Sequence, residues 1–224
     1  MSVFKDIVKL WNADDLLSQA WDESYKMMML SNEIFTQAIK YLREGENKDT
    51  IKALKKRDIE INIFQRDVRR KVVTHYAISR DIDDLPNGLV LLNMVVDVER
   101  LGDYTKNILD LALNHPNIIK SEEFSEDLYH VEQEVISRFS KTLQAIHTQD
   151  EDVARAMMVS YKETLTGVSD DIVNGCISGK ITLGDESKTV SLALYARYLK
   201  RIGAHLKNIT TVLINPFDAV GYRQ

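Results

Sequence analysis

Two pairs of oxygen-bearing side chains have the type and spacing that could do chemistry. Glu99 and Asp103 are four residues apart, so on a helix their carboxylates lie on one face, and Asp58 and Asn62 have the same spacing. Like charges in this arrangement repel by about a few tenths of a kcal/mol, a cost that a bound cation would turn into attraction. Hard and borderline cations prefer oxygen ligands, and helical bundles build such sites from facing helices. If the two helices pack antiparallel, the four side chains converge on a divalent or iron-type metal ion.

Two other interpretations of these acids stay open. They can be solvated residues on the charged helix faces of a metal-free scaffold or adaptor. They can also belong to a carboxylate-bridged metalloenzyme, but none of the five histidines follows a Glu by three residues, so the Glu-x-x-His motif of di-iron bundles is missing. No Gly-rich phosphate loop occurs either. We therefore expect a binding protein and not an enzyme, with no catalytic residues.

The elements that must position these side chains are long helices. Gly (9 residues) and Pro (3 residues) are scarce among the 224 residues, whereas sheets and irregular loops need more such breaks. Helices of this length suit an all-α, up-down bundle, in which each apolar stripe packs on its neighbours. The apolar spacing predicts helices over residues 3–11, 14–44, 48–79, 89–113, 122–148, 152–178 and 188–214.

One short pattern occurs twice in the chain. Residues 99–108 and residues 200–209 share the same Arg, Gly, Lys, Asn and Ile positions at an offset of 101 residues. An internal duplication explains this most economically. We therefore predict two tandem three-helix repeats, over residues 14–116 and 117–224, behind a short amphipathic helix within residues 1–13.

The repeated pattern resembles the signature of the PhoU family. Residues 97–103 read Asp-Val-Glu-Arg-Leu-Gly-Asp, and Asn-Ile follows at residues 107–108. Family members carry Glu-Arg-Ile-Gly-Asp followed by Asn-Ile once near the end of each of two three-helix repeats. Asp58 and Asn62 are similar to a second acidic motif of PhoU proteins. The resemblance covers about residues 14–214.

This resemblance implies a function and its partners. PhoU proteins are helical bundles, often dimers, that control phosphate uptake and phosphate signalling in the cytoplasm. Some work beside a high-affinity phosphate importer and a sensor kinase, and others beside sodium–phosphate cotransporters. We expect a homodimeric regulator that binds such a transporter or kinase. The short N-terminal helix and the Asn-Pro-Phe-Asp sequence at residues 215–218 resemble the cotransporter group.

The second repeat departs from the acidic pattern. At an offset of 101 residues, Lys200 and Ala204 replace the two acids of the signature. At an offset of 104 residues, Lys162 and Thr166 replace the second acidic pair. Protonated lysine has no lone pair to give a metal. We therefore expect a metal in the first repeat only, and a structural or partner-binding role for the second.

Residues that both repeats share are better candidates for structure than for metal binding. Gly within a helix costs about 1 kcal/mol relative to Ala, which close helix packing can offset. Arg can satisfy buried carbonyl or carboxylate groups with its fork of donors. The shared signature residues are Arg100, Gly102, Asn107, Arg201, Gly203 and Asn208.

The N-terminal segment is a candidate for partner binding. Phe4, Ile7, Val8 and Trp11 fall on one face of the helix predicted there. This face could cap the bundle or dock on a membrane partner.

Composition limits the location and the partners. The formal net charge of −5 does not favour nucleic-acid binding. Cys176 is the one cysteine, so no intramolecular disulfide can form, as is typical of a reducing compartment. We see no membrane-spanning segment and no signal peptide, and expect a cytoplasmic protein with at most peripheral contact at the inner face of the membrane.

Overall fold

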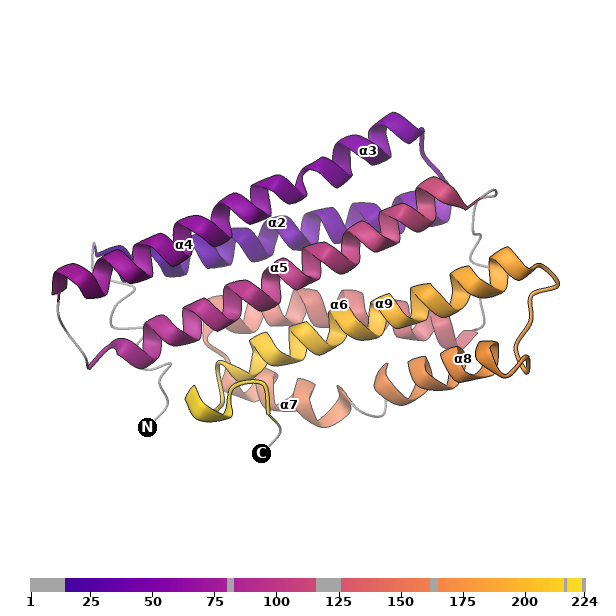
Figure 1. Cartoon of the computed structure of the whole chain (residues 1–224). Coiled ribbons are helices and arrows are strands. Elements are labelled where there is room, and N and C mark those ends of the chain that lie inside the picture. The colour runs from indigo at the N-terminus through magenta and orange to yellow at the C-terminus, as the bar shows by residue number, and fades with distance from the viewer. Residues whose placement is uncertain (1–14, 80–82, 116–125, 162–164, 216, 223–224) are drawn as a thin grey trace.

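The computed structural model describes residues 15–79, 83–115, 126–161, 165–215 and 217–222, which contain helices and no strand (Figure 1). The prediction of an all-α bundle is confirmed. In chain order the helices are α2 (Leu16–Glu44), α3 (Lys48–Lys56), α4 (Asp58–Ser79), α5 (Leu85–Asn114), α6 (Glu126–Thr148), α7 (Glu151–Tyr161), α8 (Gly167–Ile177), α9 (Glu186–Thr211) and the short 3-10 helix η3 (Phe217–Ala219).

Side-chain caps set where several helices begin. Asp15, Asn47 and Asp185 accept hydrogen bonds from backbone N–H groups in the first turns of α2, α3 and α9. Such caps satisfy donors that have no partner within the helix. Gly45, with φ of +79°, ends α2 in a conformation that glycine adopts without strain.

One of the predicted long helices is divided within the described residues. The helix predicted over residues 48–79 breaks at Arg57, whose backbone N–H bonds to the carbonyl three residues back at 3.0 Å, so the turn tightens. The Arg57 guanidinium also binds Glu33 of α2. Within the helix predicted over residues 152–178, the structure describes α7, α8 and, directly before α8, Leu165 and Thr166 in π-helical conformation.

The helices pack as two bundles that share one core. α2, α3, α4 and α5 contact one another, and in the second bundle α6 and α9 contact each other and both contact α7 and α8. α5 and α9 lie antiparallel at the centre, and α2 also contacts α6 (Figure 1). The largest fully buried side chains, Trp21, Phe35, Phe139 and Tyr195, come from both bundles and belong to one hydrophobic cluster.

A buried ion pair ties the two bundles together. Arg43, at the end of α2, lies with Nη2 2.8 Å from Oε2 of Glu132 on α6. Tyr195 of α9 donates a hydrogen bond to the same carboxylate oxygen at 2.5 Å. Because three helices from two repeats meet at this carboxylate, it fixes how the repeats are placed.

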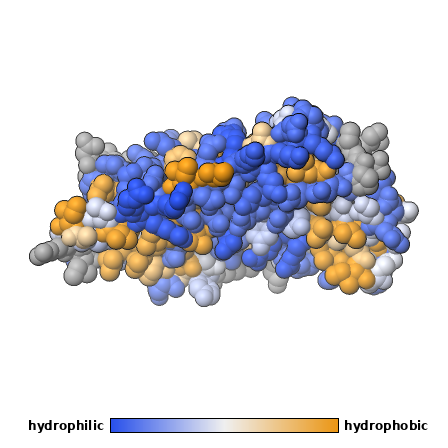
Figure 2. Space-filling model, turned by 45° about the horizontal axis from the view of Figure 1, so that its top comes forward, coloured by the Kyte–Doolittle hydropathy of each residue, from blue (hydrophilic) through white to orange (hydrophobic). Residues whose placement is uncertain are grey.

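The outer surface is mostly polar. Figure 2 shows a largely hydrophilic face with separate apolar areas. Among the described residues, no helix has the length and apolar character needed to cross a membrane.

Candidate functional site

Close approach of α4 and α5 creates the candidate site. A Cβ at Gly102 of α5 would lie 3.1 Å from Ile61 Cδ1 and 3.2 Å from Asp58 Oδ1, both on α4. The missing side chain therefore lets α4 approach and brings Asp58 against α5. A structural role for the signature glycine stays a prediction, and the close approach of α4 supports it.

An ammonium group lies between the acidic residues of the two helices. Lys106 Nζ lies 2.9 Å from Asp58 Oδ2 and 2.9 Å from Asp103 Oδ1. Asn62, one turn along α4, donates from its amide to the same Asp58 oxygen at 3.0 Å. Two of the four predicted metal ligands, Asp58 and Asp103, thus share a cation that the chain itself supplies, and a third, Asn62, is bonded to Asp58.

The fourth predicted ligand, Glu99, lies at the side of this network. Partial burial, and then the negative charge of Asp103, raise the pKa of Glu99. Arg100 Nε lies 3.6 Å from the Glu99 carboxylate, and Arg100 Nη1 donates to Asp103 Oδ2 at 2.9 Å. Arg100 therefore pairs with acids of its own helix.

Opposite charges hold Lys106 and Asp103 in their ionised forms. Burial alone would raise the pKa of Asp103, but hydrogen bonds from Lys106 and Arg100 bring the pKa below its usual value. Burial alone would lower the pKa of Lys106, but Asp103 and Asp58 raise it. The pair is therefore charged at neutral pH.

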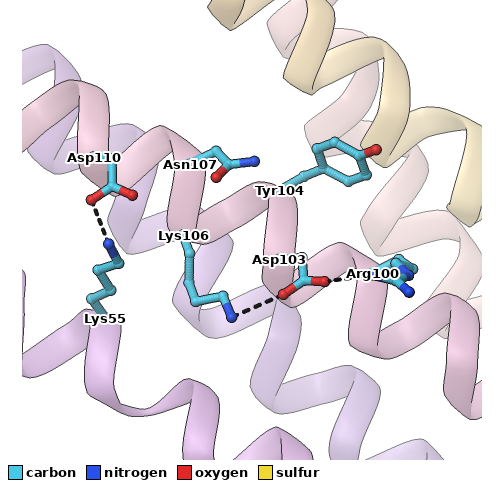
Figure 3. A pocket seen from close by; sticks show the side chains of 7 residues that line it. All are labelled: Lys55, Arg100, Asp103, Tyr104, Lys106, Asn107 and Asp110. Carbon is cyan, nitrogen blue, oxygen red and sulfur yellow. Dashed lines mark hydrogen bonds and ion pairs between the residues drawn. The ribbon is translucent and has the colours of Figure 1, made fainter.

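A surface pocket of about 440 Å³ opens beside this network. Figure 3 shows its cationic and acidic side chains directed at one another, with Lys106 bound to Asp103 and Lys55 of α3 bound to Asp110. The residues that line it are Lys55, Arg100, Asp103, Tyr104, Lys106, Asn107 and Asp110.

The acidic residues fit a metal ion in chemistry but not in arrangement. They offer hard oxygen atoms, and the buried Asp58 Oδ1 accepts no hydrogen bond from any residue that the structure describes. However, Asp58 Oδ2 and Asp103 Oδ1 are bound to Lys106. Within the described ranges, no three His, Cys, Asp or Glu side chains are placed to hold one metal ion. A metal ion would first have to displace the lysine.

The second repeat also joins its helices through a lysine. Lys200 of α9 binds both carboxylate oxygens of Asp170 on α8 at 2.6 Å. Lys207, the counterpart of Lys106 at the offset of 101, lies with Nζ 5.8 Å from the centre of the Tyr161 ring. The same lysine is thus present in both repeats but has an aromatic partner in the second.

The glycines support the alignment of the two repeats. A Cβ at Gly203 would lie 2.0 Å from Leu165 Cδ2, just as one at Gly102 would face Ile61. Ile61 and Leu165 are 104 residues apart, the offset that pairs Asn62 with Thr166. Lys162 lies outside the described residues.

Signature residues of both repeats meet between α5 and α9. Arg201 Nε donates to the Tyr104 hydroxyl at 3.0 Å. His205 Nδ1 lies 2.7 Å from Asp97 Oδ1, and Asn208 donates to the same oxygen at 3.2 Å. Arg201 and Asn208 therefore connect the repeats to each other.

The offset of 101 residues relates the two halves of this interface. It pairs Asp97 with Tyr198 and Tyr104 with His205. The Asp97–His205 contact in one half therefore corresponds to a Tyr198–Tyr104 contact in the other. The centres of these two tyrosine rings lie 6.4 Å apart. α5 and α9 are thus related by an approximate twofold axis.

Lys106, Asp97 and His205 are site residues that the sequence did not predict. One signal for Lys106 existed, because Lys106 and Lys207 are one of the five identical positions of the repeated pattern. For Asp97 and His205 the sequence holds no such signal, because they meet only when α5 packs on α9. The predicted partner-binding residues Phe4, Ile7, Val8 and Trp11 lie outside the described residues.

This architecture defines a class of protein, namely tandem three-helix bundles joined along the last helix of each repeat. The chain belongs to the PhoU family, since the model of the PhoU domain matches residues 25–112 and 128–213. The family is one of regulatory accessory proteins that are not enzymes. The predictions of the family and of a non-enzymatic protein are confirmed.

Known relatives agree with this assignment. A phosphate-specific transport system accessory protein PhoU homolog from Clostridium acetobutylicum is 25% identical over 171 residues, which cover 74% of this chain and 76% of the relative. PhoU from Pseudomonas aeruginosa has the same fold, with a TM-score of 0.75, 20% identity, and coverage of 91% of this chain and 97% of that chain. The phosphate transport system regulatory protein PhoU from Streptococcus pneumoniae has a TM-score of 0.70 and 17% identity, with coverage of 88% and 93%.

Proposed function

We propose that this protein regulates phosphate uptake by binding a phosphate transporter or its sensor kinase. The observation that carries the proposal is the match of the PhoU domain to both repeats. The Clostridium acetobutylicum relative is named as an accessory protein of a phosphate-specific transport system. A pocket whose charged side chains are already paired with one another suits a binding protein better than a catalyst.

An exposed face of α4 supports a role in protein binding. Ile59, Ile63 and Val73 are 60%, 45% and 65% exposed. With Arg66 and Arg70, which are also exposed, they fall at alternating spacings of four and three residues along α4, and so form one stripe. A stripe that mixes apolar side chains and arginine is typical of a contact surface for another protein.

The proposed partner is a phosphate importer with its sensor kinase, or a sodium–phosphate cotransporter. We place the protein in the cytoplasm as a homodimer, in peripheral contact with the membrane through its partner. We also propose residues 14–116 and 117–224 as the two functional repeats. Residues 1–13, with Phe4 and Trp11, are proposed as an additional contact for the partner.

A divalent or iron-type metal ion in the first repeat stays a prediction of the resemblance. Its ligands would be Asp58, Asn62, Glu99 and Asp103, with no metal in the second repeat. The metal content of the purified chain tests it, compared with that of Glu99→Ala/Asp103→Ala. Metal that is lost in this variant supports the prediction, and metal that the variant retains contradicts it.

Phosphate uptake in a deletion strain tests the proposed function. We expect the rate of radiolabelled phosphate uptake, or its response to external phosphate, to change on deletion and to return when the full chain is restored. A sulfate uptake assay serves as the control for general effects on transport. Unchanged phosphate uptake at both low and high external phosphate would contradict the proposal.

A further inference from the structure

We infer that Lys106 supplies the resident cation of the first repeat, so that its ammonium group and a metal ion exclude each other there. The inference rests on the contacts between α4 and α5. It does not depend on which membrane protein the chain binds.

The position of Lys106 is that of a bridging cation. Its Nζ contacts one carboxylate oxygen from each helix, both at 2.9 Å, and so links Asp58 to Asp103. Asp58 is 14% exposed and Lys106 28% exposed, so the contacts are partly shielded from water. A cation in this position offsets the repulsion between the carboxylates of Asp58 and Asp103.

Tethering favours the lysine over a free metal ion. Lys106 lies on α5, the same helix as Asp103, so its ammonium group is always present at a high effective concentration. A metal ion that uses the same oxygens must pay for breaking both contacts and for exposing the lysine elsewhere. Its apparent affinity is reduced accordingly.

Local charge balance points the same way. Lys106 and Arg100 offset two of the three negative charges of Asp58, Glu99 and Asp103. A divalent ion added to both cations would give the cluster a net positive charge. Metal binding is therefore coupled to the departure of Lys106.

In the second repeat, different residues form a lysine–carboxylate contact between the last helix and the preceding one. There Lys200 and Asp170 connect α9 to α8, and no metal is expected. Each repeat thus joins its last helix to the preceding one through a lysine–carboxylate contact. A metal ion is not needed for this purpose in either.

Calorimetric titration of the full chain with MnCl2 tests the inference. We expect Lys106→Met to bind Mn²⁺ about ten- to a hundredfold more tightly than the natural chain, the size of effect typical of groups that act on metal ligands. Lys55→Met is the matched control, because Lys55 binds Asp110 beside the same pocket without touching Asp58 or Asp103. It should bind Mn²⁺ like the natural chain.

Equal Mn²⁺ affinity of the natural chain and Lys106→Met would overturn the inference. If Lys106→Met does not fold in the absence of metal, its thermal unfolding is measured with and without MnCl2. Recovery of the folded state on addition of Mn²⁺ would support the inference. Lys106→Gln, which keeps hydrogen-bond donors without the charge, is the second variant. If no folded variant binds Mn²⁺ more tightly than the natural chain, the inference is wrong, whereas the proposed role in phosphate uptake is unaffected.

Discussion

Single glycines determine how closely the last helix of each repeat meets its neighbour. The space beside Gly203 is smaller than that beside Gly102, because a Cβ would lie 2.0 Å from Leu165 in one case and 3.1 Å from Ile61 in the other. Leu165 and Ile61 are both fully buried, so neither can move into solvent. The two repeats therefore share the glycine but tolerate a side chain there to different degrees.

Replacement of Gly203 tests this directly. We expect Gly203→Ala to lower the free energy of unfolding by about 1–3 kcal/mol through overpacking, less the gain of about 1 kcal/mol in helix propensity. Gly102→Ala should cost less. Urea denaturation measures both, and Gly203→Ala/Leu165→Ala should cost less than the sum of its single changes. An unchanged stability of Gly203→Ala would show that the helices do not need this close contact.

The Tyr195 hydroxyl gives a pH dependence at the alkaline end. Burial, and then the charge of Glu132, raise the pKa of Tyr195 well above 10. Above about pH 10 the unfolded chain releases this proton while the folded chain keeps it, so stability falls as pH rises through that value. Tyr195→Phe should show a smaller loss of stability between about pH 9 and 11. An equal loss in urea denaturation would contradict this.

At the scale of the elements, apolar spacing predicted the helices well because most pack one face on a common core. The division at Arg57 was not predictable, since its partner Glu33 lies 24 residues away and is met only after folding. Lys106 presents the same difficulty, because Asp58 is 48 residues distant. Sequence spacing shows which residues share a helix face, but not which side chain of another helix will reach them.

The junction of α2, α6 and α9 depends on a buried charge pair. Glu132→Gln leaves the Arg43 guanidinium without its carboxylate in a site where Arg43 is only 12% exposed. We expect a loss of about 3–5 kcal/mol in the free energy of unfolding. Glu44→Gln, which disturbs the exposed pair with Lys40, should change it by less than about 1 kcal/mol. Similar losses in both variants would refute the special role of the junction.

At the scale of the whole molecule, we expect the two bundles to unfold as one cooperative unit. They share a hydrophobic cluster, and α5 and α9 each contact helices of both repeats. Calorimetry should therefore give a single unfolding transition. Gly203→Ala in the second repeat and Gly102→Ala in the first should both shift that same transition. Two separate transitions, each sensitive to one variant only, would mean that the repeats unfold independently.

Identifying what the full chain binds in its native cell tests the proposed role in phosphate uptake most sharply. The tagged chain, cross-linked in intact cells and purified with its membrane partners, should carry a phosphate transporter or its sensor kinase, as found by mass spectrometry. A chain with Ile59→Asp and Val73→Asp on the α4 stripe, shown to be folded by circular dichroism, should recover less of it. Recovery of no phosphate-transport protein or kinase at either low or high phosphate would contradict the claim.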